Sequence, residues 1–213
     1  MASPRRIGAE DSKTRVLLLD AAERLMLREG YAAVTSRKVA AEAELKPALV
    51  HYYFRAMDDL FLAVFRRRAE ENLARFDRVL ESPQPLRALW ELSTEPGSSA
   101  FTVEFTALAN HRKAIRSEIA AYAERFRSAQ VAALSSRLPA YGIDVDEFPP
   151  EAFVMLMTSI SRVLAMEEGL GMTGGHAQTL ALIERTLQRF EGDPLDERAT
   201  SRSTRTEPPA QPA

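Results

Sequence analysis

Residues 35–60 read TSRKVAAEAELKPALVHYYFRAMDDL. Apolar residues recur at helical spacing on both sides of a short polar interruption. Thr35 can cap the first segment with its hydroxyl, and Pro47 fits the first turn of the second. We therefore predict two short helices, 36–43 and 47–53, joined by a tight turn. This is the helix-turn-helix arrangement, whose second helix enters the major groove of DNA.

The predicted second helix has an outward face that is unusual for a solvated helix. Val50 and Phe54 lie one turn apart and should face the core, which points Ala48 and Tyr52 away from it. Small, aromatic and imidazole groups on that face suit close approach to phosphates and base edges. The alternative is that the Tyr-Tyr-Phe run only packs against neighbouring helices, and we expect one of the two tyrosines to pack. The flanks of the face carry Leu49, His51 and Tyr53.

Longer helical patterns flank this segment. A helix over 12–29 carries an apolar stripe and is followed by Gly30, a residue favoured just after a helix end. A long helix is predicted over 57–80. Residues 1–68 carry an excess of four positive charges, and the remainder carries an excess of six negative charges. A mildly basic N-terminal module therefore precedes an acidic body, although the whole chain has a net charge of -2.

We also predict helices in the rest of the chain, where prolines separate the helical segments. No segment alternates with a period of two between turn signals, so we predict an all-α fold of about nine helices. From Asp193 onward the chain has four prolines and hardly any apolar residues, and we expect residues 193–213 to be a disordered tail. The further predicted helices span about 85–94, 98–111, 113–138, 150–168 and 176–191.

The composition excludes several classes of protein. Of 213 residues, 46% are hydrophobic and 27% charged, which are globular values. The absence of cysteine excludes disulfide scaffolds, thiol nucleophiles and cysteine metal sites. No apolar run approaches the roughly 18 residues of a membrane span, and the first residues do not form a secretion signal. We therefore expect a cytoplasmic protein.

Motifs for catalysis are weak. The segment 169–174 matches G-x-G-x-x-G, but no strand is predicted before it, so we expect a loop there rather than a dinucleotide site. The adjacent Glu167 and Glu168 are expected on a solvated face. We predict no enzymatic activity, no cofactor and no metal site. Two alternatives stay open: a helical-bundle interaction protein that does not bind DNA, and a small-molecule-binding helical enzyme. The three histidines are far apart in sequence: His51, His111 and His176.

Residues 15–65 resemble the TetR/AcrR family of bacterial transcriptional regulators. The resemblance implies a helix-turn-helix DNA-binding domain at 1–56 and a ligand-binding and dimerisation domain at 57–192. The matching residues are Ala21, Ala22, Leu25, Gly30, Tyr31, Thr35, Ser36, Val39, Ala40, the run Leu49-Val50-His51-Tyr52-Tyr53-Phe54, Asp59 and Leu60.

The resemblance implies which residues contact DNA, and two positions depart from the family pattern. Glu44 stands in the turn where glycine is usual, and it is strained if the turn needs a positive φ. Met57 stands where the family usually places a lysine on phosphate, a contact that Arg55 can take over. The implied DNA-binding residues are Ser36, Arg37, Lys46, Pro47, Ala48, Leu49, His51, Tyr52 and Tyr53.

The family also implies a cavity for a small-molecule inducer in the body. Aromatic and Met stripes at helical spacing provide apolar walls for it, although such stripes are most often plain core. Candidate polar anchors are Asn110, His111, Arg112 and Arg162, and His111 could equally be an exposed histidine. The implied ligand-binding residues are Phe65, Trp90, Phe101, Phe105, Leu108, His111, Tyr122, Phe126 and Met157.

A homodimer is expected, because one helix-turn-helix has a small footprint on DNA. The resemblance places the interface on the helices at 150–168 and 176–191, whose apolar stripes could equally be intrachain core. The expected function is a nucleoid-associated repressor in a bacterial cytoplasm that binds a palindromic operator and is released by an apolar or amphipathic ligand. The stripes are Phe153, Leu156, Met157, Ile160 and Leu164, and Leu180, Ile183, Leu187 and Phe190.

Overall fold

The computed structural model describes residues 12–195, and within that range it contains helices and no strand. The prediction of an all-α fold is confirmed. The proposed tail at 193–213 lies outside the described residues except for its first three. The helices are α1 (Lys13–Glu29), η1 (Tyr31–Ala33), α2 (Ser36–Glu42), α3 (Pro47–Tyr53), α4 (Met57–Leu80), α5 (Pro85–Thr94), α6 (Pro96–His111), α7 (Lys113–Arg137), η2 (Leu138–Tyr141), α8 (Pro150–Gly169) and α9 (His176–Glu191).

The helix ends follow the local chemistry of the sequence. The hydroxyl of Thr35 accepts a hydrogen bond from the Lys38 amide at 3.3 Å, which caps α2. Gly30 ends α1 with a φ of 80°, and its N–H donates to the Met26 carbonyl at 2.9 Å. The largest difference from the sequence prediction is that α6 begins at Pro96, two residues early, because proline is favoured in a first helical turn.

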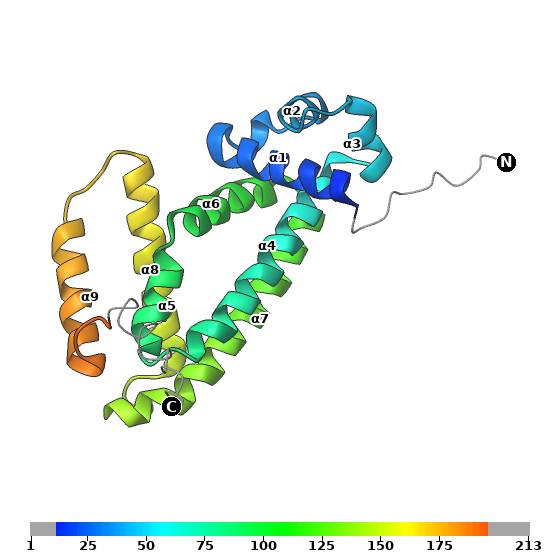
Figure 1. The fold of residues 1–213 in the computed structure, drawn as a ribbon. Coiled ribbons are helices and arrows are strands. Elements are labelled where there is room, and N and C mark those ends of the chain that lie inside the picture. Colours follow the sequence, from blue (N-terminus) through cyan, green and yellow to red (C-terminus); the bar gives the residue numbers. More distant parts are fainter. Residues whose placement is uncertain (1–11, 196–213) are drawn as a thin grey trace, which may run out of the picture.

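The molecule has a head made of α1, α2 and α3 and a body made of the remaining helices (Figure 1). In the body α4 and α7 run side by side and in the same direction. An ion pair between Arg66 and Glu118 and the contact of Arg137 with the Leu80 carbonyl mark successive levels of this pairing. The head lies at the N-terminal ends of both helices, whereas α8 and α9 lie beside them on the far side of α5 and α6 (Figure 1).

Two hydrophobic clusters hold these helices together. The second cluster joins the C-terminal half of α4 to α5, α7, α8 and α9. The first cluster joins the head to the N-terminal half of α4 and to α6 and α7, so it crosses the domain boundary expected at residue 56. Helix α6 reaches the head directly, because a Glu104 carboxylate oxygen accepts the Tyr31 backbone N–H at 2.7 Å.

Candidate DNA-binding face and ligand cavity

The turn between α2 and α3 closes through two backbone hydrogen bonds. The Leu45 N–H donates to the Ala40 carbonyl at 2.8 Å, and the Glu44 N–H donates to the Ala41 carbonyl at 3.1 Å. This pairing is the Schellman motif, which requires a left-handed residue after the helix end. Glu44 takes that conformation with a φ of 56°, the only positive φ of a non-glycine residue between 12 and 195. The strain expected at Glu44 is therefore present.

The recognition helix α3 turns one face to the core and one to solvent. Val50 and Phe54 are buried, as the helical wheel predicts, and anchor α3 on the head. Leu49 and Tyr53 are half-buried at the flanks. The exposed residues on or beside α3 are Lys46, Pro47, Ala48, His51 and Tyr52.

The two tyrosines of α3 have different surroundings. Tyr53 packs against the first hydrophobic cluster, and its hydroxyl lies 2.7 Å from the Ser12 hydroxyl. Tyr52 is exposed, and its ring meets that of Tyr53 edge to face at 5.0 Å between centroids. Tyr52 is therefore the more accessible of the two side chains, whereas Tyr53 both packs and keeps its hydroxyl near the surface.

The positive groups of the head fall into two sets. Arg24 and Arg28 on α1 pair with Glu42 on α2, and Lys38 pairs with Glu29. These pairs fasten α1 to α2. A second set makes no ion pair with any residue in 12–195, so its charge remains available to a ligand: Lys13 at the start of α1, and Arg37, Lys46 and Arg55 beside α3.

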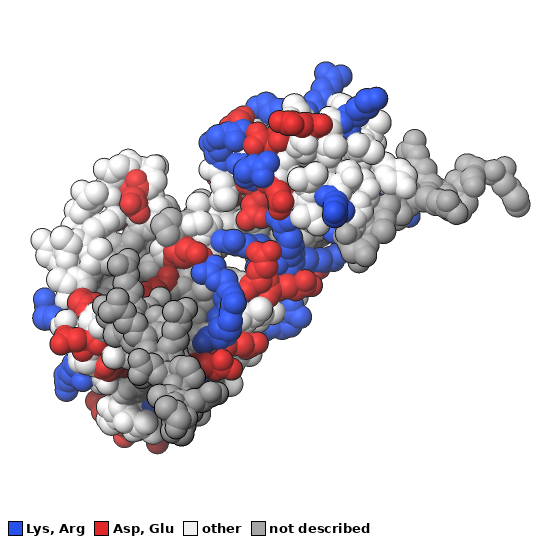
Figure 2. All heavy atoms as spheres, in the orientation of Figure 1, with Lys and Arg blue, Asp and Glu red and all other residues white. Residues whose placement is uncertain are grey.

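Three cations of this second set lie around α3. Arg37 is at the start of α2, Lys46 precedes α3, and Arg55 follows it; all three are exposed. Figure 2 shows Lys and Arg side chains projecting from the head at the end remote from the body. Met57, which stands at the position of the usual lysine, is half-buried against the first cluster. Arg55 is thus the available cation nearest the start of α4.

A cavity of about 170 Å³ lies between α4, α5, α6, α7 and α8. Its aromatic walls include five of the residues that the sequence suggested, from three different helices. Phe65 lies 5.3 Å from Phe105 and 5.5 Å from Tyr122, and Tyr122 stacks on Phe126 at 5.7 Å, all between ring centroids. The five predicted residues in the walls are Phe65, Phe101, Phe105, Tyr122 and Phe126.

The remaining four predicted ligand residues lie outside the cavity walls. Leu108 is fully buried in the first cluster, because that side of α6 packs against the head. Trp90 and Met157 belong to the second cluster. His111 is exposed at the C-terminal end of α6. The prediction that these four residues line the ligand cavity is therefore wrong.

The polar anchors also differ from those expected. Arg162 lines the cavity, but Asn110 and Arg112 lie with His111 at the exposed end of α6, where Arg112 pairs with Asp58. Helical spacing could have found some of the missed residues, because Arg68 and Asn72 lie three and seven residues after Phe65 on α4, and Gln130 lies four residues after Phe126 on α7. The missed polar residues are Arg68, Asn72, Ser93, Ser98, Ser99, Thr102, Thr106, Arg127, Gln130, Thr158 and Ser161.

Several polar groups at the cavity are incompletely paired. The Asn72 amide nitrogen donates to the Tyr122 hydroxyl at 3.3 Å, but the Asn72 carbonyl oxygen is buried without a partner in the described chain. Burial raises the pKa of the Tyr122 hydroxyl. Burial and the nearby charge of Arg127 lower the pKa of Arg162.

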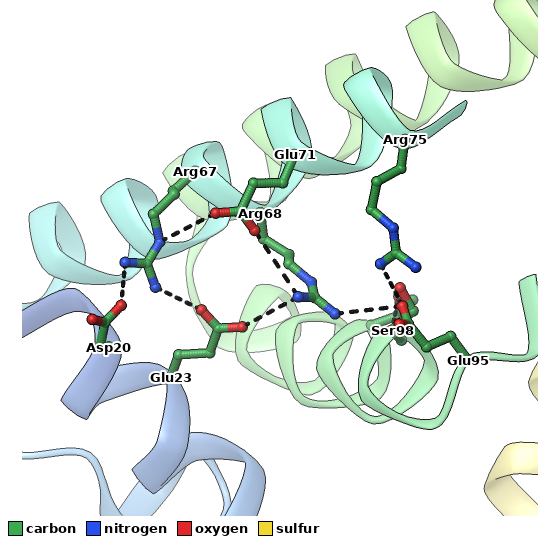
Figure 3. Close-up of polar contacts among 9 residues, drawn as sticks. Asp20, Glu23, Arg67, Arg68, Glu71, Arg75, Glu95 and Ser98 are labelled. Carbon is green, nitrogen blue, oxygen red and sulfur yellow. Dashed lines mark hydrogen bonds and ion pairs between the residues drawn. The ribbon is translucent and has the colours of Figure 1, made fainter. Parts of the chain in front are cut away.

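A chain of ion pairs connects the head with the cavity (Figure 3). Arg67 on α4 pairs with Asp20 and Glu23 on α1, at 2.5 and 2.7 Å. Arg68, the next residue, reaches Glu23 at 3.8 Å and Glu95 at 3.9 Å. Because burial is the largest influence on Arg67 and tends to lower its pKa, its raised pKa reflects how well these two carboxylates compensate. The network thus binds α1, α4 and the α5–α6 junction.

The apolar stripes of α8 and α9 are only partly covered. Met157 and Leu187 are buried, so they belong to the intrachain core. Leu156 and Leu180 are exposed, whereas Phe153, Ile160, Leu164, Ile183 and Phe190 are half-buried. Further exposed apolar residues on these two helices and their loop are Met155, Val163, Met166, Leu170, Met172 and Leu182.

The glycine-rich segment forms a loop between α8 and α9, as predicted. No strand precedes it in the described chain, and Gly171 has a φ of 74°. Glu167 is not merely solvated, because its carboxylate lies 2.8 Å from His176 Nε2. No group of three or more potential metal-ligating side chains occurs among residues 12–195. None of the helices described is long and apolar enough to cross a membrane.

The helix-turn-helix segment matches the model of bacterial regulatory proteins of the tetR family over residues 18–64. Residues 18–64 therefore form a helix-turn-helix of the tetR family type. With this segment the chain is a transcriptional regulator that carries a DNA-binding helix-turn-helix. The helix-turn-helix of α2 and α3 is accordingly its DNA-binding element.

The relatives and solved structures that resemble this chain are transcriptional regulators. The chain is 28% identical over 144 residues to the regulator BetI of Rhizobium meliloti, which covers 63% of this chain and 70% of BetI. It is 41% identical over 66 residues to BetI of Brucella anthropi, about a third of that protein's length.

Among solved structures, a regulator from Saccharomonospora viridis in complex with choline has a TM-score of 0.68 at 20% identity. That likeness covers 77% of this chain and 89% of the neighbour. A TetR regulator from Haloarcula marismortui has a TM-score of 0.65 at 20% identity, over 84% and 96% of the two chains. At these identities the neighbours establish the TetR-like fold and not the ligand.

Proposed function

We propose that this regulator is a repressor that binds a palindromic operator as a homodimer and releases it when a small molecule occupies the cavity. The observation that carries the DNA-binding part is the combination of an outward face on α3 without carboxylates and three exposed cations around it that form no ion pair within residues 12–195. The same arrangement supports action at the nucleoid of a bacterial cytoplasm.

The roles on DNA follow from position and exposure. Arg37 at the start of α2 and Arg55 after α3 hold phosphates, because both guanidinium groups are exposed. The half-buried Ser36 beside Arg37 donates its hydroxyl to a phosphate. Lys46, Pro47, Ala48 and Leu49 begin α3, and in helix-turn-helix proteins that end of the recognition helix contacts base edges. His51, Tyr52 and Tyr53 contact the DNA backbone and adjacent bases.

The homodimer rests on the exposed apolar surface of α8 and α9. Leu156, Val163 and Met166 on α8 are between 45% and 53% exposed, and Leu180 and Leu182 on α9 are 46% and 58% exposed. Large apolar side chains exposed in such number on two neighbouring elements are typical of a protein–protein contact. Two copies related by a two-fold axis cover the same face on both subunits and present two recognition helices to DNA.

Release follows from the position of α4. This helix lines the cavity through Phe65, Arg68 and Asn72, and it holds α1 of the head through Arg67 and Arg68. A ligand that binds better to one orientation of α4 shifts the population of head orientations. The two recognition helices then no longer match adjacent major grooves.

Selection of bound duplexes from a random library tests the proposal. We expect an inverted repeat whose half-sites lie about 34–36 Å apart, or a multiple of that spacing. Transcription in vitro from a promoter that overlaps the selected sequence should decrease when the protein is added. No enrichment at low salt would refute the proposal in favour of a helical-bundle interaction protein that does not bind DNA. Increased transcription would refute the repressor role.

A further inference from the structure

The cavity has a positive electrostatic character that the proposed function leaves unexplained. Arg68, Arg127 and Arg162 line it, and none of its described lining residues is Asp or Glu. Arg68 is compensated, since Glu23 and Glu95 lie within 4 Å of its guanidinium. Arg127 and Arg162 form no ion pair with any described residue. Two guanidinium groups therefore remain without a counter-charge.

These two guanidinium groups are close enough to influence each other. The positive charge of Arg127 and partial burial lower the pKa of Arg162. Arg127 on α7 is half-buried, whereas Arg162 on α8 is exposed at the edge of the cavity. A carboxylate placed between them would relieve the repulsion and form charge-assisted hydrogen bonds, the strongest kind that arginine makes.

Neutral polar side chains near these arginines also lack partners. Gln130, one turn beyond Arg127 on α7, is 8% exposed, lines the cavity and makes no side-chain hydrogen bond within 12–195. Ser99 on α6 also lines the cavity and is 6% exposed, and its hydroxyl makes no hydrogen bond within 12–195. Both side chains line the cavity, so their amide and hydroxyl groups can donate hydrogen bonds to a ligand with acceptor atoms.

The aromatic walls of the cavity limit the size of the apolar portion of a ligand. Phe65, Phe105 and Tyr122 approach one another edge-on or tilted and line one wall from α4, α6 and α7. An apolar cavity of about 150 Å³ is enough for benzene. The volume of about 170 Å³ here therefore fits one aromatic ring.

A cation is a poor fit for the same site. Aromatic rings can bind quaternary ammonium groups, but Arg68 already lies over the Phe101 ring at 5.9 Å from its centroid. Any cationic ligand would also face Arg127 and Arg162 without a carboxylate in the walls. The Saccharomonospora neighbour was solved with choline, but at 20% identity its ligand does not identify the ligand of this chain.

We propose that the cavity binds a small organic carboxylate with an apolar portion about the size of one aromatic ring. The carboxylate lies between Arg127 and Arg162, within reach of Gln130, and the ring lies against Phe65, Phe105 and Tyr122. The preference for a carboxylate is inferred from the cavity residues alone. That the carboxylate also releases DNA rests on the proposed function.

The test compares molecules of one shape and different charge. Phenylacetate, phenylacetamide, 2-phenylethylammonium and choline are titrated into the full chain without DNA, by calorimetry and by fluorescence of the single tryptophan. Trp90 suits this measurement because its neighbour Leu89 lines the cavity. We expect phenylacetate to bind at least about tenfold more tightly than the amide, because hydrogen bonds to charged groups are the stronger ones. Choline and the phenylethylammonium ion should bind more weakly still.

Matched variants test whether Arg162 is responsible for the preference for a carboxylate. Arg162→Gln should reduce the phenylacetate-to-amide ratio about tenfold, and Arg162→Lys should retain part of it. Arg185→Gln, an exposed arginine on α9 outside the cavity, should leave the ratio unchanged. Equal binding of acid and amide, preference for either cation, or no binding by any of the four would overturn the proposal.

A separate measurement distinguishes this inference from the proposed function. The affinity of the protein for its selected duplex is measured with and without phenylacetate. A protein that prefers the carboxylate but binds no DNA refutes the repressor and supports the ligand class. A protein that binds its duplex but shows no preference for the carboxylate refutes only the ligand class.

Discussion

Arg68 lines the cavity on α4, and its Nη1 lies 3.8 Å from the Glu23 carboxylate on α1 of the DNA-binding head. The same guanidinium reaches Glu95 beside α6 with its other terminal nitrogen, at 3.9 Å. A ligand that displaces Arg68 therefore changes a contact of the head directly. Figure 3 shows that Arg67 reinforces this connection by binding Asp20 and Glu23.

The first prediction concerns this connection. Glu23→Gln should weaken the coupling between the cavity and DNA, because it neutralises the carboxylate that both arginines share. Typical coupling is 5–150-fold, and we expect the effect of phenylacetate on duplex affinity to fall to less than about half of its value. Glu71→Gln is the control, since Glu71 pairs with the same arginines but within α4. An equal loss in both variants would contradict a path through Glu23.

The second prediction concerns the turn of the helix-turn-helix. Glu44→Gly should raise the free energy of unfolding by about 1 kcal/mol, because glycine adopts a positive φ without steric cost. Glu44→Ala retains the strain and should not stabilise. Chemical denaturation measures all three proteins. If the alanine variant gains as much as the glycine variant, removal of the charge and not of the strain is responsible.

The third prediction separates affinity from sequence preference on DNA. Arg37→Ala should weaken binding to all duplexes to a similar extent and lower the salt dependence by about one phosphate contact. Leu49→Ala should instead change the preferred sequence, because Leu49 lies at the N-terminal end of α3. Binding is measured on a panel of half-site variants at several salt concentrations. If both variants only scale the affinity, the division of roles is incorrect.

The fourth prediction concerns the oligomeric state. Leu156→Glu on α8 should convert the expected dimer to a monomer, because it places a charge within an apolar interface. Leu17→Glu on α1 is a matched control, as Leu17 is similarly exposed at 48% but lies on the head. Light scattering at micromolar concentration measures the molar mass of both variants. A monomeric native protein, or a dimer that survives Leu156→Glu, would place the interface elsewhere or remove it.

The fifth prediction concerns acid stability of the head. Hydrogen bonds from Arg28 and then Arg24 lower the pKa of Glu42 from 4.5 to about 2. A carboxyl group with a lowered pKa in the folded state stabilises the protein above pH 4.5 and loses that effect as pH falls towards 2. Glu42→Gln should therefore show a smaller fall in Tm across this interval. Glu44→Gln, which removes a carboxylate without an ion pair in the described chain, should follow the native protein.

The sequence predicted the fold well because its helix ends carry explicit signals. Proline at the first turn marks α3 and α5, and Thr35 marks α2, so these bounds were found within one residue. The cavity was predicted less completely. Helical spacing shows which residues share a face but not which neighbour that face meets. Leu108 lies one turn from Phe105 on α6, yet it packs against the head while Phe105 lines the cavity.

The first hydrophobic cluster has a consequence for protein engineering. Head residues such as Leu18 and Met26 share one core with Phe61 on α4 and with Phe101 and Ile115 on α6 and α7. A head cut at residue 56 would expose this shared surface and lose the carboxylate of Glu104 that holds Tyr31. A change of DNA specificity in this regulator is therefore better made by substitutions on α3 within the intact chain than by exchange of the whole head.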